Sequence, residues 1–114
     1  MKALTVRQPW AGLIARGTKD VENRTWEPTI AIGERFAIHA GRMDPNVDVE
    51  WWDPADELCH VRGLVIATVR LVDVVRDSRS EWARPGHWHW VLEDPRRTRR
   101  PVRVRGALGL WDIG

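Results

Sequence analysis

One segment near the N-terminus, residues 4–26, constrains the fold more than the rest of this chain of 114 residues. It begins with alternating apolar and polar residues, which predict a strand over residues 3–7. Pro9 then favours a helix start, because a proline in the first turn removes no hydrogen bond that the helix needs. Gly17 can adopt the left-handed conformation that ends a helix. Since a second strand is expected over residues 21–26, the segment predicts strand, short helix, turn and strand.

The rest of the sequence predicts further strands and little helix. The longest apolar run, residues 63–75, is rich in β-branched residues, so we expect a central strand that is bent or bulged. A strand over residues 88–92 is expected to end at Asp94-Pro95. The other expected elements are strands over 35–39, 102–105 and 107–113 and a short helix around 54–58. Together they predict an α+β, mainly β fold: a small, closed or nearly closed β-barrel of about six strands with one or two short flanking helices.

Length and composition predict a single domain over residues 1–114. No apolar run reaches the roughly 20 residues that span a bilayer, and the N-terminus shows no signal-peptide pattern. The one cysteine, Cys59, excludes an internal disulfide and fits a small buried residue in a reducing compartment. We therefore expect a cytoplasmic protein with no membrane contact and no disulfide-linked partner.

Polar side chains gather at both ends of the predicted helix, beside Trp10 and Trp26. They are Arg7, Gln8, Lys19, Glu22, Asn23 and Arg24. Charged groups among tryptophans are typical of a pocket for a flat polar ligand such as a nucleobase, on which a tryptophan can stack. Structural alternatives stay open: Trp10 has the spacing of a core residue, Glu22 could pair with a neighbouring arginine, and Lys19 could be a solvated turn residue.

A second cluster lies near the C-terminus, where ten residues carry six arginines and no acid. They are Arg96, Arg97, Arg99, Arg100, Arg103 and Arg105. The formal net charge of the whole chain is only +2, so this positive charge is local. Such a block indicates contact with the backbone phosphates of a nucleic acid, and the alternative is a solvated loop followed by a strand with arginines on its outer face.

The run from His87 to Trp90 alternates histidine and tryptophan, so His87 and His89 are expected on one face of a strand. A His-x-His pair can begin a zinc site, but zinc needs three or four ligands and the chain has four histidines in all. We therefore expect no bound metal and no cofactor. One of the two tryptophans, Trp88 or Trp90, is expected in the core, and the other near a cleft. His39 fits a structural histidine.

Several longer patterns occur together in this sequence. They are Arg7-Gln8-Pro9-Trp10-Ala11, Gly17-x-Lys19-Asp20-Val21-Glu22-Asn23-Arg24-Thr25-Trp26, Ile38-His39-Ala40, the strand from Gly63 to Asp73, and Gly106-Ala107-Leu108-Gly109-Leu110-Trp111. In this combination the chain resembles the ASCH domain family of the PUA-like superfamily. The likeness covers almost the whole sequence, so we expect a minimal, stand-alone ASCH protein.

The resemblance implies a β-barrel whose helices flank a cleft, and ASCH domains are generally thought to bind or act on RNA. By likeness, the cleft here is lined by Arg7, Gln8, Trp10, Lys19, Glu22 and Arg24. Trp26, at the end of the second strand beside Glu22 and Arg24, is the better candidate for stacking a base. The implied function is binding of nucleic acid, RNA in the first place, or of a modified base or nucleoside. The partner is then RNA or a modified nucleobase, with DNA left open.

Some ASCH relatives are enzymes, which gives the alternative function: a hydrolase acting on an acylated cytidine or on RNA as a ribonuclease. One branch removes acetyl groups from acetylated cytidine with a lysine, a threonine and a glutamate. In that branch the threonine lies three residues after the lysine, and here Glu22 occupies that position after Lys19. If the chain is an enzyme, Lys19, Glu22 and a displaced Thr25 form its catalytic set. The departure favours a binding module over a catalyst.

Overall fold

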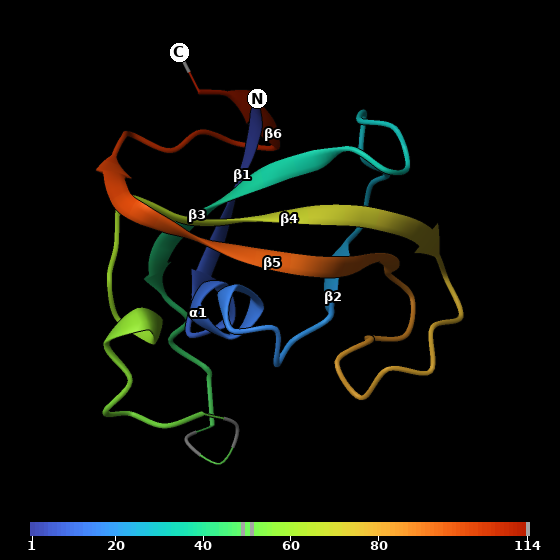
Figure 1. Ribbon diagram of the computed structural model, residues 1–114. Coiled ribbons are helices and arrows are strands. Elements are labelled where there is room, and N and C mark those ends of the chain that lie inside the picture. The colour runs from blue at the N-terminus through green and yellow to red at the C-terminus, as the bar shows by residue number, and fades with distance from the viewer. Residues whose placement is uncertain (49, 51, 114) are drawn as a thin grey trace.

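The computed structural model describes residues 1–48, 50 and 52–113, which form one mixed sheet with a short helix against it. The elements are β1 (Lys2–Gln8), α1 (Trp10–Ala15), β2 (Val21–Arg24), β3 (Arg35–Met43), the 3-10 helix η2 (Glu57–Cys59), β4 (Leu64–Val75), β5 (Trp88–Arg103) and β6 (Leu110–Asp112). The strand order is β2-β5-β4-β3-β1-β6. Only the β1–β3 pair is parallel among the described pairings. Figure 1 shows the sheet curving around α1.

These elements confirm the predicted α+β, mainly β class with six strands and short flanking helices. The curled sheet resembles a barrel only loosely. Within the described residues, no hydrogen-bonded ladder joins the edge strands β2 and β6 to close it. The long strand β4 carries the predicted irregularities, since its register against β5 shifts at three places. The predicted positions of β1, α1 and β2 agree with the structure to within two residues at each end.

The prediction that the fifth strand ends at Asp94-Pro95 is wrong, because β5 continues to Arg103. β5 passes this dipeptide as a bulge: Asp94 adopts a positive φ of 51°. The guanidinium of Arg35 donates hydrogen bonds to the Asp94 carboxylate at 3.0 Å and to its backbone oxygen at 2.8 Å. A bulge held by a distant strand therefore replaces the expected stop. The predicted separate strand over 102–105 is in part the end of β5, and β6 is shorter than the predicted 107–113.

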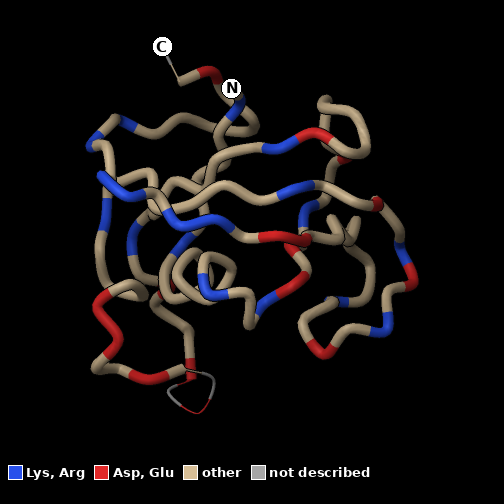
Figure 2. Tube along the Cα trace, in the orientation of Figure 1, with Lys and Arg blue, Asp and Glu red and all other residues tan. Residues whose placement is uncertain are grey.

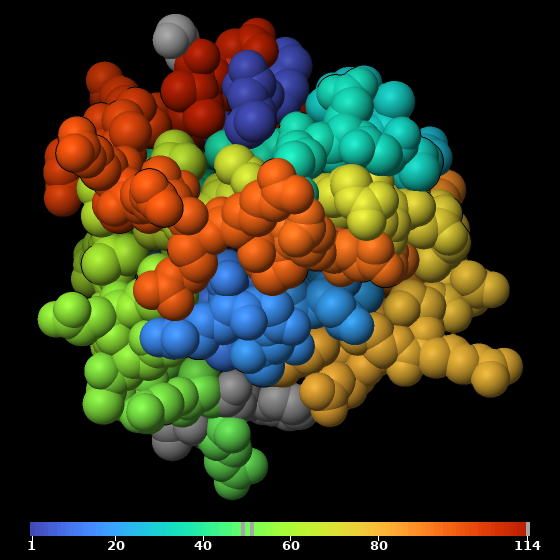
Figure 3. Space-filling model, viewed as in Figure 1, coloured from blue at the N-terminus to red at the C-terminus, as the bar shows by residue number. Residues whose placement is uncertain are grey.

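The main core lies between the concave face of the sheet and α1. It contains Leu4, Ile14, Phe36, Ile38 and Trp90, each at most 1% exposed. Fully burying such side chains stabilises a fold by roughly 1.5–3 kcal/mol each. The space-filling view shows α1 and its flanking turns directly beneath β5 (Figure 3). The helix is thus fixed against the sheet; Trp10 at its start is partly exposed, and Arg16 just after its end is exposed.

A glycine inside α1 allows η2 to pack against the helix. A Cβ atom at Gly12 would lie 2.6 Å from the Cys59 sulfur and 2.7 Å from the Leu58 carbonyl oxygen, which is too close for any larger residue. Cys59 is a free, fully buried thiol, as expected from the sequence. Burial and the nearby Asp56 carboxylate raise its pKa to about 12, so the thiol is inert. Within the described residues, no helix is long and apolar enough to cross a membrane.

Candidate functional site

Three charged side chains from the N-terminal motif meet in one cluster, the Lys19–Glu22–Arg24 triad. The Glu22 carboxylate accepts hydrogen bonds from Lys19 Nζ at 3.3 Å and from Arg24 Nη2 at 2.8 Å and Nε at 3.2 Å. The side chains of Lys19 and Glu22 are only 6% and 9% exposed, whereas that of Arg24 is 25% exposed. The triad is therefore a nearly buried ion cluster with a net charge of +1.

The two cations keep Glu22 ionised. Burial alone would raise the pKa of this carboxyl, but Lys19 and Arg24 outweigh that effect and hold the pKa below its ordinary value of 4.5. Backbone carbonyls hold the cations in turn: Lys19 Nζ donates to Val21 O, and Arg24 Nη2 donates to Thr5 O at 3.0 Å. Glu22 is thus ionised at neutral pH, and hydrogen bonds hold all three side chains in place.

Hydrogen-bond donors remain free in the triad after these contacts. The Lys19 ammonium has three N–H groups, of which Val21 O and Glu22 take two. Nη1 of Arg24 has no partner among the described residues, which leaves two further donors. Glu22 has filled three of its roughly four acceptor positions. The triad therefore presents mainly donors, and an oxygen acceptor is the group that it can bind best.

The triad lies in an open cleft with a volume of about 1410 Å³. One wall comes from the N-terminal motif and includes Trp10 and Trp26. A second wall comes mainly from three segments distant in sequence, residues 41–48, 81–84 and 107–109. Such a cleft is large enough for a nucleoside with its sugar and phosphate, since small-ligand sites commonly measure about 300–1,000 Å³.

Contacts between the two walls fix the shape of the cleft. Trp10 Nε1 donates to the Asp44 carboxylate at 3.0 Å, and its ring meets the edge of Trp82 at a centroid distance of 6.2 Å. Asn23 donates to Trp82 O at 2.9 Å and accepts from the Arg84 backbone N–H at 2.9 Å. Asn23 therefore holds the distant loop in place. Trp82, Asp44 and Arg84 are cleft residues that the sequence reasoning missed.

The predicted ligand-binding residues do not all face the cleft in the same way. Arg7, Trp10, Lys19, Glu22, Arg24 and Trp26 line it. Trp26 packs edge-on against the core residue Trp90 at 5.0 Å and is partly exposed. Gln8 is fully buried, and its amide donates to Leu58 O and Val61 O and accepts from Gly12 N. Gln8 thus joins β1, α1 and the η2 segment, and it has no polar group left for a ligand.

The candidate nucleophile and the histidine pair have different surroundings. Thr25 is exposed and lines the cleft, and within the described chain its hydroxyl forms no hydrogen bond to Lys19 or Glu22. His89 is buried, with one ring nitrogen 2.7 Å from Arg84 O and the other accepting from Ser78 N at 3.1 Å. His87 lines the cleft. No group of three or more metal-binding side chains occurs among the residues described.

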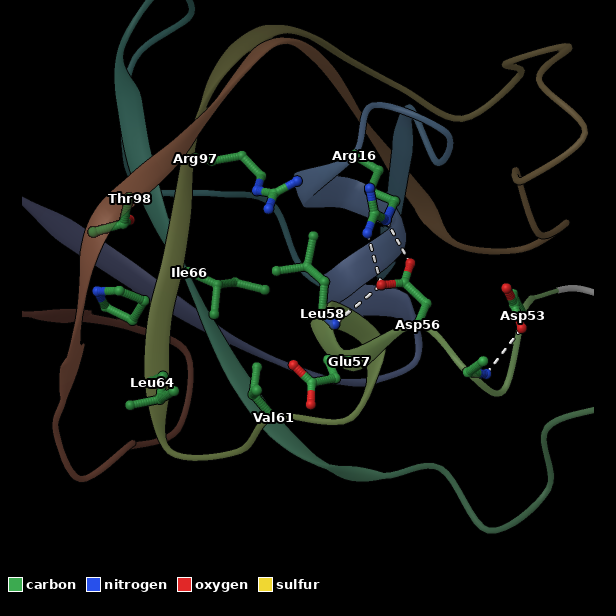
Figure 4. A pocket seen from close by; sticks show the side chains of 12 residues that line it. Arg16, Asp53, Asp56, Glu57, Leu58, Val61, Leu64, Ile66, Arg97 and Thr98 are labelled. Carbon is green, nitrogen blue, oxygen red and sulfur yellow. Dashed lines mark hydrogen bonds and ion pairs between the residues drawn. The ribbon is translucent and has the colours of Figure 1, made fainter.

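The arginine-rich segment lies apart from the cleft. Except for Arg105, which follows the strand, it forms the C-terminal part of β5 and appears as a series of blue positions along that strand in Figure 2. Arg97 borders a second, smaller hollow of about 640 Å³ together with Arg16 and the η2 segment (Figure 4). This hollow shares no lining residue with the cleft. Arg96 pairs with Asp94 at 3.0 Å. The two positive features therefore occupy separate surfaces.

The fold of this chain is similar to that of a bacterial protein of known structure. A crystal structure of ASCH from Zymomonas mobilis superposes with a TM-score of 0.66 and 17% identity, covering 99% of this chain and 87% of that one. A mutant of the same bacterial protein gives a TM-score of 0.65 with equal identity and coverage. At this identity the likeness shows the fold alone. No curated protein sequence matches the chain. Because the family model of the ASCH domain matches residues 4–101, this chain belongs to the ASCH domain family.

Proposed function

We propose that this ASCH domain binds an unpaired nucleobase, from RNA or from a modified nucleoside, in the cleft at the Lys19–Glu22–Arg24 triad. The observation that carries the proposal is the triad itself. The buried Glu22 carboxylate holds Lys19 and Arg24 in place, while some of their N–H donors stay free for a ligand. A buried ion cluster adds little to stability compared with well-packed apolar residues, so stability alone does not account for it. Its position in an open cleft of about 1410 Å³ supports a ligand-binding role.

The chemistry of the triad favours an oxygen acceptor on the ligand. Free N–H groups of Lys19 and Arg24 can donate to a base carbonyl or to a phosphate oxygen. The cleft lining supplies five cationic side chains and four carboxylates, a difference of +1. That small charge fits a neutral base with one phosphate better than it fits a highly charged polyanion. The remaining acceptor position of Glu22 can take one N–H of the same base.

Tryptophans supply the apolar part of the site. Trp10, Trp26 and Trp82 all line the cleft, and each is held by a contact on one side. A base stacked on one aromatic ring gains roughly 1–3 kcal/mol. Rigid rings lose little entropy when a base binds to them, and the donors of Arg24 then fix the orientation of the base.

Calorimetric titration with normal and modified nucleosides, their monophosphates and a short single-stranded RNA tests the proposal. Arg24→Lys keeps the positive charge beside Glu22 but removes the guanidinium fork, and we expect at least a tenfold loss of affinity. Arg70→Lys is the matched control, because Arg70 forms a similar pair with Glu93 at 3.0 Å outside the cleft. Absence of binding across the panel at low salt refutes the proposal.

The same panel separates binding from turnover. The wild-type protein is incubated with acylated cytidines and with RNA, with and without divalent metal ions, and the products are separated by chromatography. We expect all substrates to remain intact, since the Thr25 hydroxyl has no hydrogen bond to Lys19 or Glu22, the groups that could activate it as a nucleophile. Turnover abolished by Lys19→Ala replaces the binding proposal with the hydrolase alternative.

A further inference from the structure

The strand that carries the arginine-rich segment leaves the regular sheet in that region. Val65 pairs with Val102 and Ala67 pairs with Arg97, so β4 has one residue between these pairings and β5 has four. The four are Thr98, Arg99, Arg100 and Pro101. β5 therefore bulges outward here, and Arg99 and Arg100 are exposed.

The guanidinium groups on this bulge lack acidic partners. We define the arginine bulge as Arg97, Arg99, Arg100 and Arg103. All four are exposed, and within the described part of the chain none has an ion pair, whereas the adjacent Arg96 has one. Arg103 donates only to a backbone oxygen, that of Arg62, at 3.3 Å. Unpaired like charges repel one another, so the folded chain bears a cost that a bound polyanion would remove.

The hollow beside the bulge is lined in part by carboxylates, which disfavour a bound anion. In Figure 4, Arg97 extends from β5 over an apolar floor that includes Leu58 and Ile66. The opposite wall carries Asp53, Asp56 and Glu57, and Asp56 is paired with Arg16 through two hydrogen bonds. Carboxylates on that wall repel phosphate. A polyanion is therefore expected along the outer side of the arginine bulge and not inside the hollow.

The arginine bulge and the cleft are connected through α1 and β5. Trp10, at the start of α1, lines the cleft, and Arg16, just after its end, lines the hollow. Helix geometry gives a rise of about 9 Å between these two residues. Along β5, Trp90 pairs with Glu22 of the triad, and Arg97 follows seven residues later, at most roughly 23 Å away.

We propose that the ligand is a single-stranded oligonucleotide: one base occupies the cleft, and the neighbouring phosphates contact the arginine bulge. This inference rests on the proposed function and narrows its ligand to a polynucleotide. The separation fits the roughly 4–16 nucleotides that one small single-strand-binding barrel covers. The nucleic acid must be single-stranded, because only an unpaired base can stack on the cleft tryptophans.

Affinity as a function of length and salt tests the inference, with fluorescence anisotropy on a uridine monophosphate, a 4-mer and a 12-mer of RNA. We expect the 12-mer to bind at least tenfold more tightly than the monophosphate. Four phosphate contacts predict that its affinity falls about 50-fold between 50 and 200 mM salt. Arg99→Gln with Arg100→Gln reduces that fall to about sevenfold. The control Arg79→Gln removes an exposed arginine outside both surfaces and leaves the salt dependence unchanged.

Other results of these titrations would overturn this inference alone or the cleft proposal with it. Equal affinity for the monophosphate and the 12-mer, with no effect of Arg99→Gln and Arg100→Gln, overturns this inference and leaves the cleft proposal standing. If Arg24→Lys leaves the affinity for the 12-mer unchanged, both this inference and the cleft proposal are overturned, because the arginine bulge then binds the RNA without the cleft. Duplex RNA that binds as tightly as the single strand also overturns the inference. Single-stranded DNA of the same sequence shows whether the sugar is recognised.

Discussion

Replacing Glu22 by glutamine tests whether the triad is as tightly coupled as its geometry indicates. The variant leaves the Lys19 ammonium, only 6% exposed, beside a neutral amide. Breaking a buried ion pair on one side costs about 3–5 kcal/mol. The glutamine oxygen can still accept one hydrogen bond, so we expect the lower value, about 3 kcal/mol. With an unfolding entropy of roughly 2.1 cal/mol/K per residue over 114 residues, this corresponds to a Tm lowered by about 12 °C.

The assay is urea unfolding followed by tryptophan fluorescence, and Glu93→Gln is the matched control. Glu93 pairs with Arg70 on the surface, where the two side chains are 60% and 42% exposed. An exposed pair of this kind contributes roughly 0–1 kcal/mol. Lys19→Met combined with Glu22→Gln is expected to cost less than the sum of the two single changes, by at least about 1 kcal/mol.

The effect of Glu22→Gln has a specific pH dependence. The pKa of Glu22 lies below 4.5 in the folded protein, because Lys19 and Arg24 outweigh the burial that would raise it. The stabilisation by this carboxylate is therefore complete above the unfolded pKa and is lost as the pH falls through the lower, folded value. The difference between wild type and Glu22→Gln should shrink below about pH 4.5. A cost equal to that of Glu93→Gln, or one unchanged from pH 7 to pH 3, refutes the argument.

Three further predictions concern residues around the cleft. Gln8→Leu leaves one buried and two partly buried backbone groups without the amide partner, so we expect a loss of roughly 3 kcal/mol in urea unfolding; a loss below 1 kcal/mol would contradict that role. Trp26→Leu should weaken nucleoside binding by roughly 1–3 kcal/mol in calorimetry, whereas Trp111→Leu, outside the cleft, should not. Cys59 should resist thiol reagents at pH 8 in the native state, because burial raises its pKa to about 12; rapid labelling without denaturant would count against this.

Local signals in the sequence were sufficient for β1, α1 and β2, whereas β3 extends four residues beyond its predicted end. Pro9, Gly17 and the apolar stripe between them act within one or two turns of chain, so their meaning does not depend on distant contacts. The same holds for β4, whose β-branched run is long enough to identify it as a central strand.

The path of β5 could not be predicted in this way. An Asp-Pro pair normally ends a strand, because proline lacks the N–H group that a ladder needs. Here Arg35 holds Asp94 in a bulge through contacts across 59 positions of sequence. That interaction depends on β3 and β5 being close together, which becomes evident only once the sheet is built. The arginine bulge follows from the same long-range registration against β4.

Only one of the two walls of the cleft could be predicted from the sequence, for a similar reason. The wall formed by residues 19–26 is continuous in sequence, and its charged residues next to tryptophans are visible there. The other wall comes from segments near Asp44 and Trp82, which are distant in sequence and are joined to the first wall by contacts that include those of Trp10 and Asn23. A tryptophan in the polar, turn-rich stretch around Ser80 was the one available signal for that wall.

The state of Glu22 favours the proposed binding function over the hydrolase alternative. A general acid or base works best when its pKa lies near the working pH. The two cations on Glu22 lower its pKa, and three hydrogen bonds occupy most of its acceptor positions. Such a carboxylate is poorly suited to shuttle protons at neutral pH, and it is well suited to hold Lys19 and Arg24 in fixed positions. The same arrangement that weakens Glu22 as a catalyst therefore preorganises the donors for an oxygen of the ligand.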